Sequence, residues 1–201
     1  AYEKKYGKEV YQQALSQIND HIGDSVLDLY TVGKLSGLTE VLFIERCIRL
    51  LKPGGRLGIV LPEGVLNNTN LQAVRELFEE MAKIILITSI PQDVFMASGA
   101  TVKPSLLFFK KFTTEERAQF DAIKQAATEE VGSKYQSQLD KIDSFLAERG
   151  NSAEEKKAKR AERRALETKI AAEIWAIVKE KFDYTIPIAQ VEKAGITTTG
   201  A

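Results

Sequence analysis

The chain has 201 residues, and its 28 Lys and Arg balance 28 Asp and Glu, so net charge gives no overall attraction to nucleic acid or to a membrane surface. Its length fits one ordinary domain with room for a smaller appendage. The one cysteine, Cys47, excludes an internal disulfide framework and favours a reducing, cytoplasmic location. No run approaches the roughly 18 apolar residues that a membrane helix needs, which excludes a membrane-spanning class.

The amino-terminal stretch "AYEKKYGKEVYQQ" has no apolar signal core and does not begin with Met, so we expect a processed or excised chain. His21 has no other histidine or cysteine near it, which predicts a surface or capping histidine rather than a metal ligand. Cys47 lies within an apolar helical pattern, so a packed thiol is expected there rather than a nucleophile.

A helix is predicted over residues 38–51, "LTEVLFIERCIRLL", because its apolar positions recur at helical spacing. The following "KPGG" ends it, since Pro cannot continue the hydrogen-bond ladder and Gly accepts left-handed backbone angles. The short run "RLGIVL", residues 56–61, then predicts a strand that is covered on both faces, as in parallel sheets.

A second amphipathic helix is predicted over residues 71–81, with Thr69 or Asn70 as its N-cap. Strands are predicted at 83–90, "KIILITSI", and at 105–112, "SLLFFKKF". The first two strands are joined through a helix and should be parallel. The third follows a loop too short for a helical crossover and should run antiparallel, which completes an α/β layout.

Beyond residue 112 the apolar period becomes helical throughout, first up to about residue 146 and again over 152–182. Gly150-Asn151 between them is a turn signal, so the two stretches predict a long antiparallel helical hairpin. The predicted domains are therefore 1–112 for the partial sheet domain, 113–182 for the hairpin and 183–201 for a truncated C-terminal segment that is partly extended.

The second hairpin helix contains "EEKKAKRAERR", residues 154–164, in which basic residues outnumber acidic ones. This pattern is typical of a solvated helix, or of a patch in which Lys156, Lys157 and Arg160 contact phosphates. No aromatic residue lies among these charges, so base stacking is not indicated there.

Several stretches resemble the later half of the catalytic domain of N6-adenine DNA methyltransferases, in particular the modification subunits of type I restriction-modification systems. These stretches are "LFIERCIRLLKPGGRLGIVLPEGVLNN", "IPQDVFMASGATVKPSLLFFKK" and "IAQVEKAGITTTG". The resemblance implies the C-terminal portion of a class I Rossmann-like sheet. Its last three strands would then be the three predicted here, with the final antiparallel strand inserted between its neighbours.

Ligands of open α/β sheets bind outside the carboxyl ends of the strands, where "PEGVLNN" leaves "RLGIVL". Pro62 should end the pairing of that strand because it has no amide donor. Glu63, Asn67 and Asn68 then either cap the next helix or turn polar groups toward substrate. These four residues are the candidate active-site rim.

The resemblance implies methyl transfer from S-adenosylmethionine to adenine N6 in DNA. Family members hold the cofactor with a glycine-rich turn and align the adenine with an (Asn/Asp)-Pro-Pro-(Tyr/Phe) tetrapeptide. This chain has no Gly-x-Gly and no Pro-Pro, so it contains no catalytic residue of that kind. We expect the chain alone neither to bind the cofactor nor to methylate DNA.

Related enzymes place an aromatic residue of the loop between the last two strands against the flipped base, and Phe95 holds the matching place; a Phe packed in its own core is the alternative. Lys103 of the same loop is a weaker candidate for a phosphate contact and could equally face solvent. The resemblance also implies DNA, a specificity subunit and a restriction subunit as partners, with the hairpin as an interaction arm by analogy.

Two other functions are open from the sequence. One is a non-catalytic interaction module made of a partial Rossmann domain and a hairpin, and the other is half of a methyltransferase that acts on another substrate. Because the strand at 56–61 would leave an unpaired apolar edge, we expect the chain to self-associate.

Overall fold

The computed structural model describes residues 1–99, 101–148 and 150–193, which form two compact units. The first unit contains residues 1–52, 56–111 and the described residues from 188 onward, and the second contains 53–55 and 112–187. The boundary after residue 111 lies beside the one expected from the sequence. Residues 188–193 belong to the first unit, although the sequence set 183–201 apart as a separate segment.

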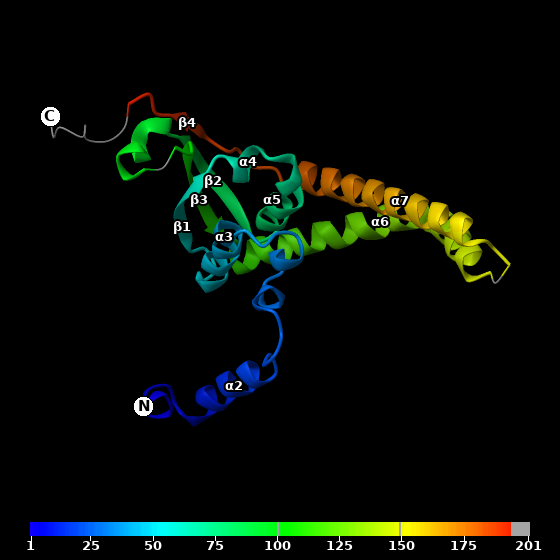
Figure 1. Cartoon of the computed structure of the whole chain (residues 1–201), viewed down its shortest axis with the longest axis horizontal. Helices are drawn as coiled ribbons and strands as arrows, with labels where there is room; N and C mark the ends of the chain where they lie inside the picture. Colours follow the sequence, from blue (N-terminus) through cyan, green and yellow to red (C-terminus); the bar gives the residue numbers. More distant parts are fainter. Residues whose placement is uncertain (100, 149, 194–201) are drawn as a thin grey trace. The chain divides into compact units, whose positions relative to one another are not determined.

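The first unit contains one four-stranded sheet with the order β1-β3-β2-β4. Its strands are β1 (Arg56–Pro62), β2 (Ala82–Ser89), β3 (Pro104–Lys111) and β4 (Ile188–Gln190). β3 lies between β1 and β2 and is antiparallel to both, so β1 and β2 are parallel to each other (Figure 1). The predicted strands, their common sheet and the antiparallel direction of the third are confirmed.

β4 pairs with β2 in parallel, from Ile87 opposite Ile188 to Ser89 opposite Gln190. The amide of Val191 then donates to the carbonyl of Ser89 at 2.9 Å. The sequence indicated only an extended piece here, because three residues are too few to show a strand period. The stretch "AGITTTG" that follows lies outside the described residues.

α3 (Thr39–Leu50) confirms the first predicted helix and ends one residue earlier than expected. Its last carbonyls are satisfied from β3, because Lys111 Nζ donates to the carbonyl oxygens of Arg49 (3.1 Å) and Leu51 (2.8 Å). A lysine at this position also complements the negative end of the helix dipole. Gly54 follows with φ of 74°, as the turn requires.

The predicted N-cap of the second helix is wrong. Asn68 caps the 3₁₀ turn η3 (Thr69–Leu71), and its Oδ1 accepts from the amide of Asn70 at 2.9 Å. α5 (Gln72–Glu79) begins only after that turn, so neither Thr69 nor Asn70 caps it. A sequence pattern cannot separate a 3₁₀ turn from the helix that follows it directly.

The core of the first unit joins α3, α5 and one face of the sheet. Its buried residues are Val32, Val41, Ile44, Ile48, Leu61, Val65, Leu71, Val74, Phe78, Ala82, Leu107 and Phe109. Phe78 and Phe109 meet edge to face, with ring centroids 6.5 Å apart. Each large apolar side chain buried here contributes about 2 kcal/mol.

The expectation that β1 is covered on both faces is wrong for this strand. Its burial alternates, and Val60 is 48% exposed on the face opposite the core. On that face Gly58 lies opposite Phe108, whose ring stands 2.9 Å from the place of a Cβ at residue 58. The glycine in "RLGIVL" thus makes room for a cross-strand ring, and the α3–α5 core accounts for one face only.

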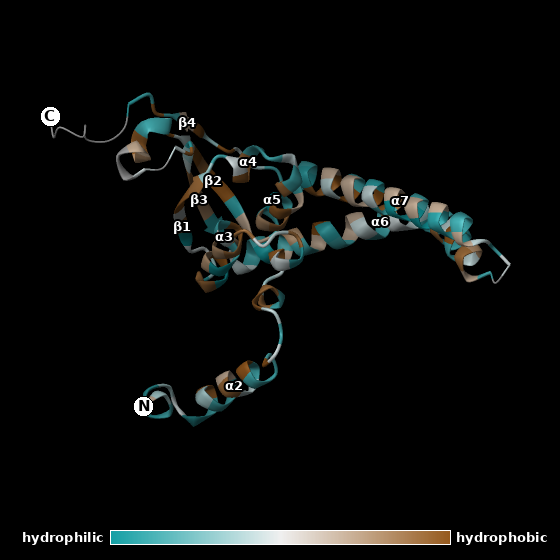
Figure 2. Cartoon of the chain, viewed as in Figure 1, coloured by the Kyte–Doolittle hydropathy of each residue, from teal (hydrophilic) through white to brown (hydrophobic). Residues whose placement is uncertain are grey.

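No helix or strand is predicted from the sequence for residues 1–37. In the structure they contain α1 (Tyr2–Tyr6), α2 (Lys8–Asn19) and two 3₁₀ turns, η1 (Val26–Leu29) and η2 (Val32–Lys34). α1 and α2 have no buried residues, and Figure 2 shows apolar residues along α2. His21 is exposed with its Nδ1 3.1 Å from Asp24 Oδ2, which agrees with the expected surface role. Cys47 is free and half-buried.

The second unit is the predicted antiparallel hairpin of α6 (Thr114–Ala147) and α7 (Ala153–Lys181). Thr113 with Glu116 and Ser152 with Glu155 form complete capping boxes, which explains where both helices begin. The buried aromatic cluster at the base of the hairpin consists of Phe112, Phe120 and Phe182 with Trp175 packed against them. In the described part of the chain, no helix is long and apolar enough to span a membrane.

One buried carboxylate, Glu45, fastens the η1–η2 segment to α3. Its oxygens accept from the amides of Thr31 (3.0 Å) and Val32 (2.8 Å), and Arg49 Nη2 lies 2.5 Å from Oε1. The Glu45 side chain is fully buried, so its charge is stable only with these partners.

We therefore expect Glu45→Ala to lower the free energy of unfolding by about 3 kcal/mol, because it removes a buried ion-pair partner and leaves two amides unsatisfied. Urea unfolding followed by circular dichroism measures this change. Arg46→Ala, an exposed change on the same helix, is the matched control and should shift the midpoint little. Equal effects of the two substitutions would contradict the assignment.

A polar clamp joins the middle of the two hairpin helices. Lys134 Nζ donates to Glu173 Oε2 at 2.8 Å, and the Tyr135 hydroxyl donates to Glu173 Oε1. These bonds, first that from Lys134 and then that from Tyr135, lower the pKa of Glu173. The bond to Glu173 also raises the pKa of Lys134.

Because the pKa of Glu173 is lowered, its stabilisation exists above the ordinary carboxyl pKa and is lost as pH falls through the lowered value. Glu173→Gln should therefore lower the thermal midpoint at neutral pH, with a difference from wild type that shrinks in acid. Melting curves at several pH values check this, with the exposed Glu130→Gln as control. A difference that stays constant down to strongly acidic pH would contradict it.

Candidate functional site

The candidate rim lies where β1 ends and β3 begins. Pro62, the last residue of β1, is in register with Pro104, the first residue of β3. Neither proline can donate an amide hydrogen bond, and the last backbone bond between the two segments lies one residue beyond this pair, from the Glu63 amide to the Lys103 carbonyl. β1 and β2 are parallel, so their carboxyl ends share this edge of the sheet, which is where ligands of open α/β sheets bind.

The structure brings Glu63 and Lys103 together at this edge. The Glu63 amide donates to the Lys103 carbonyl at 2.9 Å, and Lys103 Nζ lies 3.0 Å from Glu63 Oε1. The two side chains are 35% and 40% exposed, so the ion pair adds little stability. Its effect is to tie the exit of β1 to the entry of β3, and an incoming phosphate would compete with Glu63 for Lys103.

Glu63 is the N-cap residue of the short helix α4 (Gly64–Asn67), but its side chain makes no cap bond because it pairs with Lys103. Asn67 is exposed at the end of α4, and Asn68 is exposed with its side-chain oxygen engaged in the η3 cap. Of the two roles open to these residues, Asn68 takes the capping one.

Arg75 of α5 holds this rim segment in place, and the sequence did not single it out. Its Nη1 donates to the carbonyl oxygens of Val65 (3.2 Å) and Asn68 (2.7 Å). The two acceptors lie on either side of Asn67, so a single guanidinium fixes the backbone there. No sequence signal distinguishes this arginine from an ordinary surface arginine, since its acceptors are main-chain atoms.

The loop between β2 and β3 contains η4 (Gln92–Ser98) with Phe95, which is 36% exposed. Gln92 Nε2 donates to the carbonyl of Thr101 at 2.8 Å and so draws the two ends of the loop together. Beside this bond lies an open pocket of about 290 Å³, lined by Gln92, Asp93, Met96 and Thr101. Phe95 is thus on the surface of the loop and is not part of the core of the first unit.

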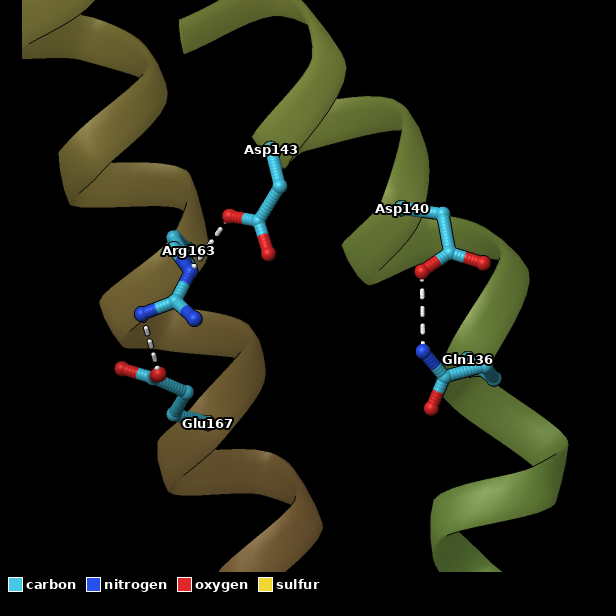
Figure 3. Close-up of polar contacts among 5 residues, drawn as sticks. All are labelled: Gln136, Asp140, Asp143, Arg163 and Glu167. Carbon is cyan, nitrogen blue, oxygen red and sulfur yellow. Dashed lines mark hydrogen bonds and ion pairs between the residues drawn. The ribbon is translucent and has the colours of Figure 1, made fainter. Parts of the chain in front are cut away.

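In the second unit, the basic residues of α7 differ in their contacts with acidic side chains. Arg163 donates to Asp143 of α6 (2.8 Å) and to Glu167 (2.7 Å), as Figure 3 shows, and Lys159 donates to Glu162 (2.7 Å). Gln136 and Asp140, also drawn there, bond to each other along α6. Lys157 and Arg160 are exposed and Lys156 is half-buried. The basic stretch is therefore partly structural, and Lys157 and Arg160 present the more accessible charges.

Metal chemistry finds no support in the described ranges 1–99, 101–148 and 150–193, which contain no group of three or more His, Cys, Asp or Glu able to hold an ion. The site instead consists of a fixed polar edge, Glu63, Asn67 and Lys103, and a loop that presents Phe95. This arrangement offers polar and aromatic contacts at one edge of the sheet.

The family model of N-6 DNA methylase matches residues 30–186. The chain is similar to the type I restriction enzyme EcoKI M protein, with 29% identity over 39% of this chain and 16% of that one and a TM-score of 0.35. It is also similar to a chain from a study of the assembly of a type I R-M system, with 34% identity, 38% and 16% coverage and a TM-score of 0.34.

A further similar structure is described as a class I S-adenosylmethionine-dependent methyltransferase from Listeria monocytogenes, with 24% identity, 44% and 27% coverage and a TM-score of 0.39. A search of the curated proteins found no match. The chain spans only 16% to 27% of the length of these solved structures.

The sheet has an antiparallel strand inserted between two parallel ones, which is the strand arrangement that the resemblance implied for the last strands of a Rossmann-like methyltransferase sheet. Because the family model covers most of the chain, from residue 30 to residue 186, the chain belongs to the N-6 DNA methylase family. The match begins at Tyr30 and includes the rim and the whole hairpin, α6 and α7.

The role of Arg75 can be tested on the chain itself. Arg75→Gln removes two hydrogen bonds from a charged donor, so the rim segment should open more readily by about 2 kcal/mol. Hydrogen exchange of the amides of residues 63–71 should then be faster, while the exchange of β3 stays unchanged. Arg46→Gln is the control. Unchanged exchange at the rim in Arg75→Gln would contradict the bracing role.

Proposed function

We propose that this chain is part of a DNA methyltransferase that transfers a methyl group from S-adenosylmethionine to adenine N6, within a type I restriction-modification system. The observation that carries the proposal is the family match over residues 30–186. The polar edge beyond Pro62, on the side where ligands of such sheets bind, supports it. The similarity to two type I system proteins favours that system over other adenine methyltransferases.

In this proposal the rim faces the extruded nucleotide. Adenine must leave the helix before its amino group can react, at a cost of a few kcal/mol for unstacking and unpairing. Phe95, on an exposed part of η4, packs against the flipped base and offsets part of that cost by stacking. Asn67 supplies polar contacts, and Lys103 can exchange its partner Glu63 for a backbone phosphate.

The cofactor chemistry belongs to the parent protein. S-adenosylmethionine supplies the methyl group when bound, but this sequence has neither a Gly-x-Gly turn nor a Pro-Pro tetrapeptide to hold it and align the base. The residues present thus do not fit a cofactor site by themselves. We infer that the chain alone is inactive and that Pro62, Glu63, Asn67 and Phe95 contribute to substrate contact only, whereas Asn68 caps η3.

In this proposal the hairpin contacts the DNA backbone and the other subunits. Lys157 and Arg160, with Lys156 beside them, are the candidates for contact with the DNA backbone, because Arg163 and Lys159 already have acidic partners. The length of α6 and α7 suits a role as an arm toward the specificity and restriction subunits. A cytoplasmic location stays a prediction from the single cysteine.

The same hairpin favours a second candidate function, a non-catalytic interaction module. The surface of the hairpin is mostly polar, and each of its two helices begins with a complete capping box. In that case the sheet would be a scaffold. The two candidates differ in what the parent gene encodes before Ala1. A glycine-rich turn and an Asn-Pro-Pro-Phe-like tetrapeptide support the methyltransferase, and an unrelated domain supports the module.

The decisive experiment measures transfer of labelled methyl groups from S-adenosylmethionine to DNA by the parent protein, followed by identification of the modified base. N6-methyladenine is expected. Phe95→Ala should lower the rate by about tenfold or more, since stacking is worth about 1–3 kcal/mol per base. Met96→Ala, a change at the exposed neighbour, is the matched control. Absence of methyl transfer, or 5-methylcytosine as product, would overturn the proposal.

The chain alone offers a complementary measurement. Titration with S-adenosylmethionine in a calorimeter should give no appreciable heat, because the groups that hold the cofactor are not in this sequence. Tight binding would show that the chain has a cofactor site of its own, and the proposal that it contributes only substrate contacts would then be wrong.

A further inference from the structure

The amino-terminal segment carries an apolar stripe that no described residue of its own unit covers. Between Tyr2 and Val26 an apolar residue recurs at every fourth position. These seven residues are Tyr2, Tyr6, Val10, Ala14, Ile18, Ile22 and Val26, and all are exposed. Ile18 is 63% exposed and Ile22 75%, which is unusual for isoleucine.

On α2 these positions form a ridge. Val10, Ala14 and Ile18 are spaced i, i+4 and i+8, and Tyr11 and Leu15 widen the apolar face. With Tyr2 and Tyr6 of α1 they line an open apolar groove of about 430 Å³. A helix of 12 residues is marginal in water without packing, so an apolar partner on this face would stabilise α2.

The distribution of charge along the segment indicates which partner fits the stripe. Lys4, Lys5 and Lys8 outnumber Glu3 and Glu9 at the start of the segment, and Asp20 and Asp24 make its end acidic. Two copies aligned in parallel would bring like charges together at both ends. Two antiparallel copies bring the basic end of one beside the acidic end of the other, and their helix dipoles are then opposed as well.

The ridge also suits a two-fold arrangement. On α2 Ala14 is the centre of the ridge, with Val10 one turn before it and Ile18 one turn after it, so the helical ridge has the same order of large and small residues in both directions. A small residue at the crossing point lets two helices approach closely, and i±4 ridges pack into each other at the commonest crossing angle of globular proteins. A two-fold contact requires this kind of self-complementary surface.

We propose that the stripe from Tyr2 to Val26 binds a second copy of this chain, antiparallel, with the two-fold axis near Ala14. The interface is of the small class, so the association is weak and depends on protein concentration. A membrane surface suits the stripe less well, because the polar side of α2 carries Gln12, Gln13, Gln17 and Asn19 rather than a row of lysines. The contact holds whether or not the parent protein methylates DNA.

Sedimentation equilibrium of the whole chain tests the proposal. A monomer–dimer equilibrium is expected, and Ile18→Asp should weaken it about tenfold or more, since it places a charge within the apolar contact, one helical turn from the two-fold axis. Gln12→Asp introduces the same charge on the opposite side of α2 and is the matched control. Circular dichroism and melting curves show that each variant keeps the fold of the sheet and hairpin.

Cross-linking tests the geometry. In a Cys47→Ser background, Ala14→Cys should form a disulfide between copies, because residues at a two-fold crossing reach the required Cα separation, whereas Gln12→Cys should not. The double variant Lys4→Glu/Lys8→Glu should weaken an antiparallel dimer by placing acidic residues beside Asp20 and Asp24, and should leave a parallel dimer unchanged.

Association through the edge of β1 is the competing outcome. Val60→Lys places a lysine on the exposed side of that edge strand, and it should leave the proposed dimer intact. Three results would overturn the proposal: a monomer at every concentration, a dimer unaffected by Ile18→Asp, or a dimer lost in Val60→Lys alone.

Discussion

The pairing of β3 on both of its edges is the interaction on which the first unit depends. β3 is antiparallel to β1 on one side and to β2 on the other, and its buried Leu107 and Phe109 face the α3–α5 core. Without β3 the parallel strands β1 and β2 would have no hydrogen-bond partner in common. The same strand also supplies Lys111, which satisfies the end carbonyls of α3.

The direction of β3 also places the rim. Because β3 is antiparallel, it starts where β1 ends, and the loop that enters it delivers Lys103 beside Glu63. A parallel strand in this position would begin at the other edge of the sheet and leave Glu63 without this partner. The antiparallel direction of β3 thus brings Glu63 and Lys103, which are 40 positions apart in the sequence, together at one polar edge.

Buried or half-buried polar side chains then fix the segments that carry no regular structure. Glu45 fastens the 3₁₀ turns before α3, and Arg75 fastens the backbone on either side of Asn67. Both side chains bond to main-chain groups, so each bond constrains the backbone directly, which an exposed ion pair between two side chains does not. The Glu63–Lys103 pair, being half-exposed, is easier to open, which suits a site that exchanges partners with a ligand.

The sequence by itself determined the elements with a strong apolar period: α3, the three long strands and both hairpin helices were predicted within about two residues. It also determined the antiparallel direction of β3, because the preceding loop is too short to cross the sheet. Only the tertiary structure decided that β4 joins β2, that Asn68 rather than Asn70 caps, that Lys103 pairs with Glu63 and that Arg75 braces the rim. The physical reason is that periodicity records which residues are buried together along one element, whereas these contacts join single side chains to backbone groups or to residues distant in the chain.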